Sequence, residues 1–136
     1  MTTSNTITKT DLENILNEVL PSCAVDYVVE QGTSGYWTYR KWDSGIAEMW
    51  FNGSTTVAIA TTAGSLYTSN TDTKLNYPFT LNSVHYASIT AHSISYAIWA
   101  WKSAESTASM SCRLFSIASR SSANYPVTAY VKGTWK

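Results

Sequence analysis

YWTYRKWDSGIAEMW, residues 36–50, decides the fold of this chain because it predicts a β-hairpin rich in large aromatic side chains. Asp43, Ser44 and Gly45 supply a three-residue loop between two runs of strand-forming residues. Gly45 can adopt the left-handed backbone conformation that closes a type I turn with a bulge. The two runs are therefore expected to pair as antiparallel strands around this loop.

Pairing Trp42 with Ile46 sets the register of the whole hairpin. The remaining cross-strand pairs are then Lys41 with Ala47, Arg40 with Glu48, Tyr39 with Met49, Thr38 with Trp50 and Trp37 with Phe51. Successive side chains of a strand point to opposite faces, so the register also assigns the faces. The face expected to be core carries Trp37, Tyr39, Ala47, Met49 and Phe51, with the stem of Lys41 beside them near the turn.

The opposite face of the hairpin combines charged and aromatic side chains. It carries Thr38, Arg40, Trp42, Ile46, Glu48 and Trp50. Arg40 and Glu48 are predicted to form a cross-strand ion pair between these bulky neighbours. Two interpretations stay open: a structural salt bridge flanked by partly exposed aromatic rings, or an interface with a partner.

The composition indicates one domain that is rich in β-structure and sparse in charge. The 136 residues carry nine basic and nine acidic side chains, so the net charge is zero. Without a basic stripe to neutralise phosphates, nucleic-acid binding is not expected. Six Trp and nine Tyr argue against disorder. Abundant Ser and Thr with little charge is typical of sheets that expose polar, uncharged faces, as in adhesins and virion proteins.

The lack of a membrane-spanning run and of a secretory signal predicts a protein made in the cytosol. No apolar run approaches the roughly 18 residues of a membrane span, so membrane insertion is not expected. Residues 1–16 lack the basic start and apolar stretch of a secretory signal. Cys23 and Cys112 are too few for a disulfide framework and are interpreted as buried free thiols, with a single bridge as the alternative.

Residues 7–20 are predicted to form an amphipathic helix. Its apolar stripe, at helical spacing, is Leu12, Ile15, Leu16, Val19 and Leu20. A helix this short is marginal alone in water, so its stripe must pack either on its own domain or on copies of itself.

The ends of this helix are also marked in the sequence. Thr8 with Asp11, or Thr10 with Glu13, can form a capping box, and Ile7 could pack on Leu12 in the first case. Pro21 is expected to end the helix. We therefore divide the chain into an N-terminal segment, 1–21, for oligomerisation or packing, and a β-domain, 22–136.

The rest of the chain predicts an antiparallel β-protein. Besides the hairpin, strand-like runs cover residues 24–30, 55–62, 84–91, 96–102, 111–118 and 127–135. Asn52-Gly53 is a second turn signal, and residues 67–77 are expected to be a long loop or a very short edge strand. The predicted fold is mainly β: an antiparallel β-sandwich or jelly-roll-like domain preceded by one short amphipathic α-helix.

Catalytic and metal-binding patterns are weak. His85 and His92 are seven residues apart, which places them on opposite faces of a strand, where they cannot share a metal ion. No GxSxG motif is present. A glycoside hydrolase would need two facing carboxylates, and the candidates in the β-region are Asp26, Glu30, Asp43 and Glu48. Asp43 is better explained by the turn and Glu48 by Arg40, so no catalytic residue, metal or cofactor is predicted.

Trp99 and Trp101 lie two residues apart in YAIWAWK and therefore share one face of a strand. Such a pair can belong to the core, to a subunit contact or to a stacking platform for sugar rings. Core or subunit contact is the favoured interpretation, and the sugar platform is the alternative.

DYVVEQGTSGYWTYRKWDSGIAEMW (residues 26–50) and the closing YVKGTWK (130–136) resemble a pattern in C-terminal modules of phage and prophage tail proteins of Gram-positive hosts. There, a hairpin of the form WxYRKWxxGxAExW opens a β-sandwich and a Gly-x-Trp-Lys strand closes it. A looser likeness runs through LYTSN, YPF and SxxCRLFSIASR. The shared motif is structural, so it transfers no receptor-contacting residue.

This resemblance implies a trimeric tail-fibre or baseplate component of the virion, assembled in the bacterial cytoplasm beside other tail proteins. Its β-sandwich heads would present a receptor-binding surface, and the helix would help to associate three copies. Tail fibres usually carry a long N-terminal attachment region, so a chain of this length indicates a fragment or a minor tip protein.

The sequence therefore favours a non-enzymatic protein that binds a host-cell-surface receptor, expected to be a glycan, as a multivalent homotrimer. A sugar would stack on an exposed aromatic ring and accept neutral hydrogen bonds from Ser, Thr or Asn. The candidate ligand-binding residues are Trp42, Asp43 and Trp50, on the less core-like side or the tip of the hairpin. The alternatives are a purely structural virion subunit and, less favoured, a cell-wall glycan hydrolase.

Overall fold

The computed structural model describes residues 8–23 and 25–136, and all of their side chains except those of 17–23. The described elements are α1 (Lys9–Cys23), β1 (Val28–Ser34), β2 (Trp37–Trp42), β3 (Ile46–Ala63), β4 (Leu66–Ser69), β5 (Thr73–Asn76), β6 (Ser83–Ala91), β7 (Ile98–Glu105), β8 (Ser109–Ser116) and β9 (Arg120–Thr134). All strand pairs are antiparallel. The predicted mainly-β class, with a short helix in front of the strands, is confirmed.

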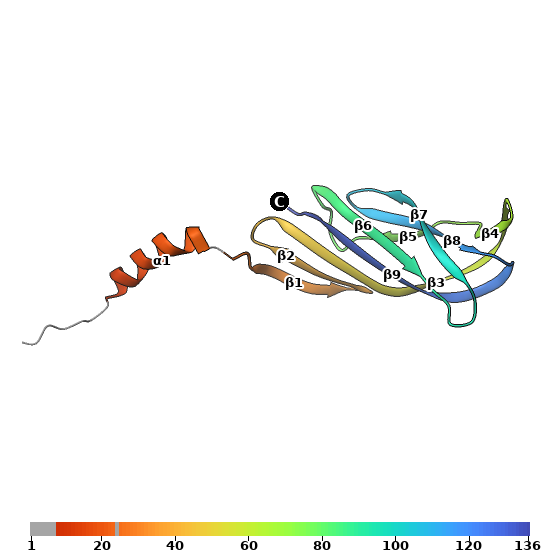
Figure 1. The fold of residues 1–136 in the computed structure, drawn as a ribbon, viewed down its shortest axis with the longest axis horizontal. Helices are drawn as coiled ribbons and strands as arrows, with labels where there is room; N and C mark the ends of the chain where they lie inside the picture. Colours follow the sequence, from red (N-terminus) through yellow and green to blue (C-terminus); the bar gives the residue numbers. More distant parts are fainter. Residues whose placement is uncertain (1–7, 24) are drawn as a thin grey trace, which may run out of the picture.

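The strands form one curled sheet that folds over on itself (Figure 1). The long strands β3 and β9 pair along most of their length, with β2 and β1 beyond β3 and β6 beyond β9. The far end of β3 turns through β4 into a second group, in which β8 pairs with β4, β5 and β7. Trp37 of β2 contacts Tyr77 just after β5, with 5.6 Å between ring centroids, so the two groups pack face to face like a sandwich.

Both groups of strands contribute to one hydrophobic core. From the β3 and β9 side come Trp37, Ala47, Met49, Phe51, Val127 and Val131, and from the β5 and β8 side come Leu75, Tyr77, Met110, Cys112 and Leu114. Along β8 buried and half-buried residues alternate strictly, as expected for a strand with one face on the core. The core thus lies between the β3 and β9 layer and the β5 and β8 layer.

The central hairpin forms in the predicted register. All five pairs from Lys41 with Ala47 to Trp37 with Phe51 are observed between β2 and β3. Gly45 has a φ of 95° and its N–H donates to the carbonyl of Trp42 at 3.0 Å, which is the predicted turn. The face predicted to be core is buried or half-buried throughout. The chain end is tied to the same turn, since the N–H of Trp135 donates to the carbonyl of Gly45.

The predicted Arg40–Glu48 ion pair is not formed, although the two residues are paired in register. Glu48 instead accepts a hydrogen bond from the hydroxyl of Tyr130 at 3.0 Å. The guanidinium of Arg40 lies over the ring of Trp50, 5.6 Å from its centroid. The hydrogen bond from Tyr130 of β9 and a cation–π contact therefore replace the cross-strand salt bridge. At a surface, that salt bridge would stabilise the fold by only about 0–1 kcal/mol.

Asn52-Gly53 does not form a turn, and this prediction was wrong. β3 runs straight through it, pairing Asn52 with Thr128 and Gly53 with Val127. Gly53 serves a close approach: a Cβ there would lie 2.6 Å from the tip of the Phe51 ring and 3.1 Å from Tyr36. Long-range pairing with β9 and this packing outweigh the local turn preference.

Several strand boundaries also differ from the predictions. Residues 67–77, expected as a long loop or very short edge strand, contain most of β4 and all of β5, and both strands pair with β8. The strand predicted over 24–30 begins only at Val28 and continues to Ser34. Cys112 is a buried free thiol, as predicted, and the side chain of Cys23 lies outside the described part of the structure.

Helix α1 starts at its predicted cap but passes its predicted end. Thr8 Oγ1 accepts the N–H of Asp11 at 3.2 Å, and the Asp11 carboxylate accepts the N–H of Thr8 at 3.1 Å. These are the two bonds of the first proposed capping box; Ile7 lies outside the described residues. Pro21 does not end the helix, which continues to Cys23 without the hydrogen bond that a proline cannot donate to the carbonyl four residues earlier.

The apolar stripe of α1 is exposed as far as its side chains are described. Leu12, Ile15 and Leu16 face solvent, so they are not buried on a strand of the same chain. No described helix combines the length and apolar character needed to cross a bilayer. The division into segments 1–21 and 22–136 stays a prediction, with the helix ending two residues past the first boundary.

Candidate functional site

The three residues predicted to bind ligand do not come together in one site. Trp50 on β3 pairs with Thr38 on β2, and Thr38 lies four residues before Trp42 on the same strand. At the usual rise per residue of a β-strand, four residues separate Trp42 from the position of Trp50 by about 13 Å. Trp42 is half-buried at the end of β2, and its carbonyl accepts the indole N–H of Trp135 at 2.9 Å. Asp43 is exposed in the turn, with a carboxylate oxygen 3.7 Å from the ammonium of Lys136. Their ligand-binding role stays a prediction.

Trp50 belongs to a row of side chains across the outer face of the sheet. From β2 to β6 the row contains Arg40, Trp50, Tyr130 and Tyr86, with ring centroids 5.8 Å apart for Trp50 and Tyr130 and 6.1 Å apart for Tyr130 and Tyr86. Burial and the hydrogen bond to Glu48 raise the pKa of Tyr130 to about 12. A hollow of about 400 Å³ beside this row is lined by Trp50, Tyr130 and the small polar residues Asn52, Ser88, Thr90 and Thr128.

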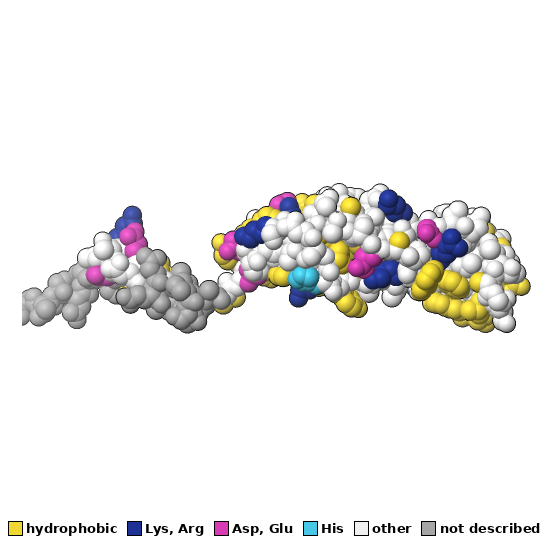
Figure 2. Space-filling view, turned by 90° about the horizontal axis from the view of Figure 1, so that it is seen from above, with side chains coloured by type: hydrophobic (Ala, Val, Ile, Leu, Met, Phe, Trp, Pro, Cys, Tyr) yellow, Lys and Arg dark blue, Asp and Glu magenta, His cyan; other side chains and the backbone are white. Residues whose placement is uncertain are grey.

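Trp99 and Trp101 share one face of β7, as predicted, but that face is not core. Their side chains are 39% and 55% exposed, on either side of Phe115. With Leu66 they line an apolar hollow of about 330 Å³. Figure 2 shows hydrophobic side chains gathered at the end of the domain where β4, β7 and β8 lie. The core interpretation was wrong, because these rings lie with Phe115 on the opposite face of the β7–β8 pair from the buried Leu114; the subunit-contact interpretation stays a prediction.

The candidate carboxylates serve structural contacts. Asp26 accepts the N–H groups of Ser44 and Tyr27, each at 3.0 Å, and its pKa is lowered mainly by the hydroxyl of Ser44. Glu30 accepts from the ammonium of Lys41 at 2.9 Å, which lowers its pKa. A glycosidase acid needs a raised pKa, so neither residue is suited to that role.

The histidines and the described acidic residues do not assemble a metal site. His85 and His92 are both exposed, and His85 contacts the hydroxyl of Ser83 at 3.3 Å. Among the described residues, no group of three or more His, Cys, Asp or Glu side chains is placed to hold a metal ion.

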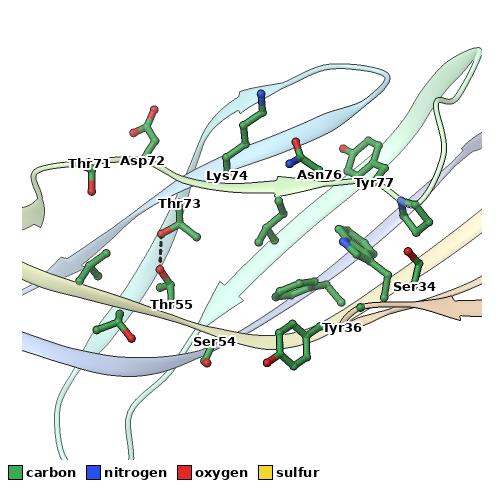
Figure 3. Close-up of a pocket in the computed structure, with 17 residues that line it drawn as sticks. Ser34, Tyr36, Ser54, Thr55, Thr71, Asp72, Thr73, Lys74, Asn76 and Tyr77 are labelled. Atoms are coloured by element: carbon green, nitrogen blue, oxygen red, sulfur yellow. Dashed lines mark hydrogen bonds between the residues drawn. The ribbon is translucent and has the colours of Figure 1, made fainter.

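A cleft of about 730 Å³ lies at the open edge between the two layers, and we call it the interlayer cleft (Figure 3). One wall is β5 with the residues around it, 71–78, and the other is formed by 54–57 of β3 and the β1–β2 turn, 34–37. The cleft exists because β5 pairs with β8 on one side and, among the described strands, with none on the other. Its volume lies in the range of about 300–1,000 Å³ that is usual for small-molecule sites.

Aromatic rings and neutral polar groups together line the interlayer cleft. The buried rings of Trp37, Phe51 and Tyr77 form its back, while Tyr36, 69% exposed, lies at its rim. The polar lining is mostly hydroxyl and amide: Ser34, Ser54, Thr55, Thr56, Thr71, Thr73 and Asn76. Thr55 and Thr73 join the two walls through a hydrogen bond of 2.9 Å between their hydroxyls (Figure 3).

Two charged residues also border the cleft. Asp72 is paired with Arg113 of β8, whose Nε donates to its carboxylate at 2.6 Å. The neighbouring Lys74 is exposed. Burial, with a smaller contribution from the charge of Glu105, raises the pKa of Tyr77 to about 12, so this phenol is neutral at physiological pH.

The interlayer cleft was not predicted from the sequence. Its walls come from three separate segments, and one of them, 71–78, falls largely in the region expected to be a loop. The available signal was compositional, since that region is rich in Thr and Asn beside Tyr77 and Pro78. Such a bias does not identify which segment will lie opposite.

No family model matches this sequence, and no curated protein matches it. Among solved structures, an R1 pyocin fibre of P. aeruginosa comprising C-terminal residues 323–701 matches with a TM-score of 0.57 and 13% identity, over 94% of this chain and 32% of that one. An N-truncated R1-type pyocin tail fibre matches with a TM-score of 0.52 and 12% identity, over 96% of this chain and 99% of that one.

These likenesses show a shared fold. The chain spans about a third of the first fibre's length and nearly all of the second. Both of these solved structures are fibres, and the hairpin motif resembles one found in phage tail proteins. P. aeruginosa is Gram-negative, so the Gram-positive host implied by that motif is not supported by these neighbours.

Proposed function

We propose that this chain is a receptor-binding head of a phage-tail-type fibre, located on the tail of a virion or related particle, that attaches to a glycan of the host-cell surface without catalysis. The observation that carries the proposal is a fold shared with two pyocin fibres over at least 94% of the chain, in a domain with a cleft lined by aromatic rings and neutral hydrogen-bonding groups. Its partners would be copies of itself, other tail proteins and the glycan.

The interlayer cleft is the proposed receptor site. Sugar rings present apolar C–H faces and hydroxyl edges, so they need an aromatic surface together with hydrogen-bonding groups. Tyr36 offers the exposed ring, and the hydroxyls of Thr55 and Thr73 offer hydrogen-bonding groups at the point where they join the two walls. The Trp50 hollow, with Tyr130 and its Ser and Thr residues, is a second surface of the same kind.

Replacing Tyr36 by alanine is expected to weaken glycan binding about tenfold, since the rim would lose its stacking surface. Tyr36 lies outside the core, so the thermal unfolding temperature should change little. The measurement is titration of the full chain with the strongest binder from a glycan array.

Tyr27→Ala is the matched control, because Tyr27 is a 59% exposed tyrosine outside the interlayer cleft. Equal losses in both variants, or no loss in Tyr36→Ala, would place the receptor elsewhere. Trp50→Ala in the same titration tests whether the glycan binds at the Trp50 hollow.

Trimer formation through α1 is the second part of the proposal. The exposed stripe of Leu12, Ile15 and Leu16 is an apolar surface that three parallel copies could bury together. Three sites on one particle would then bind a repetitive host surface far more tightly than one site, by effective concentration.

Light scattering of the full chain is expected to give the mass of three copies, and Ile15→Lys to give that of one, because a buried lysine would break the stripe. Asn14→Lys places the same charge on the opposite face of the helix and should leave the trimer intact. A monomeric native chain, or a trimeric Ile15→Lys, would contradict this assembly.

A purely structural subunit is the second candidate function. The exposed Trp99, Trp101 and Phe115 favour it, because an apolar face without polar groups suits a protein contact better than a sugar. A glycan array and host-cell binding that stay silent at high protein concentration would support this alternative.

A further inference from the structure

The charges beside the interlayer cleft lie on the far side of β5 from its interior. Successive side chains of a strand alternate between faces, and Leu75 is buried in the core. Thr73, two residues before it, reaches Thr55 on the opposite wall. Lys74 points away from Thr73, as Figure 3 shows, so its ammonium is directed out of the cleft.

The carboxylate of Asp72 is also directed away from the cleft interior (Figure 3). It is neutralised by Arg113, with 2.6 Å between the carboxylate oxygen and Nε. A ligand between the walls would therefore meet neither a free cation nor a free carboxylate from β5.

The hydroxyl pair at the centre of the cleft favours a ligand that donates hydrogen bonds. Each threonine hydroxyl has one donor and two acceptor positions. The bond between Thr55 and Thr73 uses one donor and one acceptor, leaving one donor and three acceptors. A carboxylate or phosphate group only accepts hydrogen bonds, so it would find a single donor here, whereas sugar hydroxyls both donate and accept.

We propose that the ligand of the interlayer cleft is an electrically neutral glycan, held by the hydroxyls of Thr55 and Thr73 and stacked on Tyr36, and not an acidic polymer. This inference rests on the proposed function and narrows the class of its receptor. The specificity for a neutral glycan arises because sugar hydroxyls can donate hydrogen bonds to the three free acceptor positions of the two threonine hydroxyls.

The test compares binding of the full chain to neutral hexose oligosaccharides and to hexuronic acid oligosaccharides of matched length. We expect the neutral series to bind at least about tenfold more tightly. The affinity for it should change less than about twofold between roughly 0.05 and 0.5 M salt, because exposed charges are screened over this range and none contributes. Lys74→Gln should bind the neutral series like the native chain.

Valine and serine variants at Thr73 separate the role of the hydroxyl from folding. Thr73→Val keeps the shape of the side chain and should lose about tenfold in affinity, while Thr73→Ser keeps the hydroxyl and should retain most of it. Thr61→Val, at an exposed position of β3, is the matched control, and circular dichroism checks that all variants fold.

Two outcomes would overturn the inference while leaving the proposed function intact. One is preferential binding of the hexuronic series with an affinity that falls as salt rises, and the other is a tenfold loss in Lys74→Gln. Absence of binding to any glycan would overturn the proposed function and the inference with it.

Discussion

Gly133→Ala is expected to destabilise the domain by about 3 kcal/mol or more, the largest effect that we anticipate from adding one methyl group. A Cβ at Gly133 would lie 2.1 Å from the backbone carbonyl oxygen of Ser83 and 3.0 Å from a methyl carbon of Leu81. A backbone oxygen cannot rotate away as a side chain can. The start of β6 would therefore have to move off β9, which costs pairing at Val84 and its neighbours.

Urea denaturation followed by tryptophan fluorescence measures this loss. Gly32→Ala is the matched control, because its Cβ would meet no backbone atom but the outer end of the Tyr39 side chain, 3.0 Å from the hydroxyl oxygen and 3.2 Å from Cζ. That variant should lose less than about 1 kcal/mol. Similar midpoints for the two variants would mean that the β6 edge is not held against Gly133 in solution.

Trp37→Ala is expected to cost about 3–5 kcal/mol, as is usual for removal of a large buried aromatic side chain. Trp37 is 5% exposed and is packed edge-to-face on Phe51, 5.2 Å away, and on Tyr77, 5.6 Å away. It therefore connects the central hairpin to the opposite layer. Its loss should also widen the interlayer cleft and weaken glycan binding.

Trp101→Ala provides the comparison, since it removes the same side chain from an exposed position on β7. We expect it to change the free energy of unfolding by less than about 1 kcal/mol. The two values, measured by thermal and urea unfolding, should differ severalfold. A large cost for Trp101→Ala would instead indicate that its face is covered by another copy.

The features that were predicted correctly depend on neighbours in the sequence. The hairpin register follows from Gly45 and the alternation of the two arms around it, and all five observed pairs agree. The capping box of Thr8 and Asp11 involves residues three apart. The closing strand predicted at residues 127–135 pairs with both β3 and β6.

The features that were missed depend on residues far apart in the sequence. Asn52-Gly53 has a strong turn preference, but pairing of Gly53 with Val127 and packing of Phe51 over the bare glycine outweigh it. Glu48 takes a partner 82 residues away, Tyr130, in place of the nearby Arg40.

The sequence alone therefore determined the hairpin, the helix start and the mainly-β class. A turn, a helix cap and an alternating strand pattern each depend only on residues close together in the sequence. Only the tertiary structure decided where a ligand could bind. The interlayer cleft arises where the curled sheet brings 54–57 opposite 71–78 and where no described strand pairs with the outer edge of β5. The packing of the whole core determines which distant segments meet. No short stretch of the sequence therefore predicts the cleft.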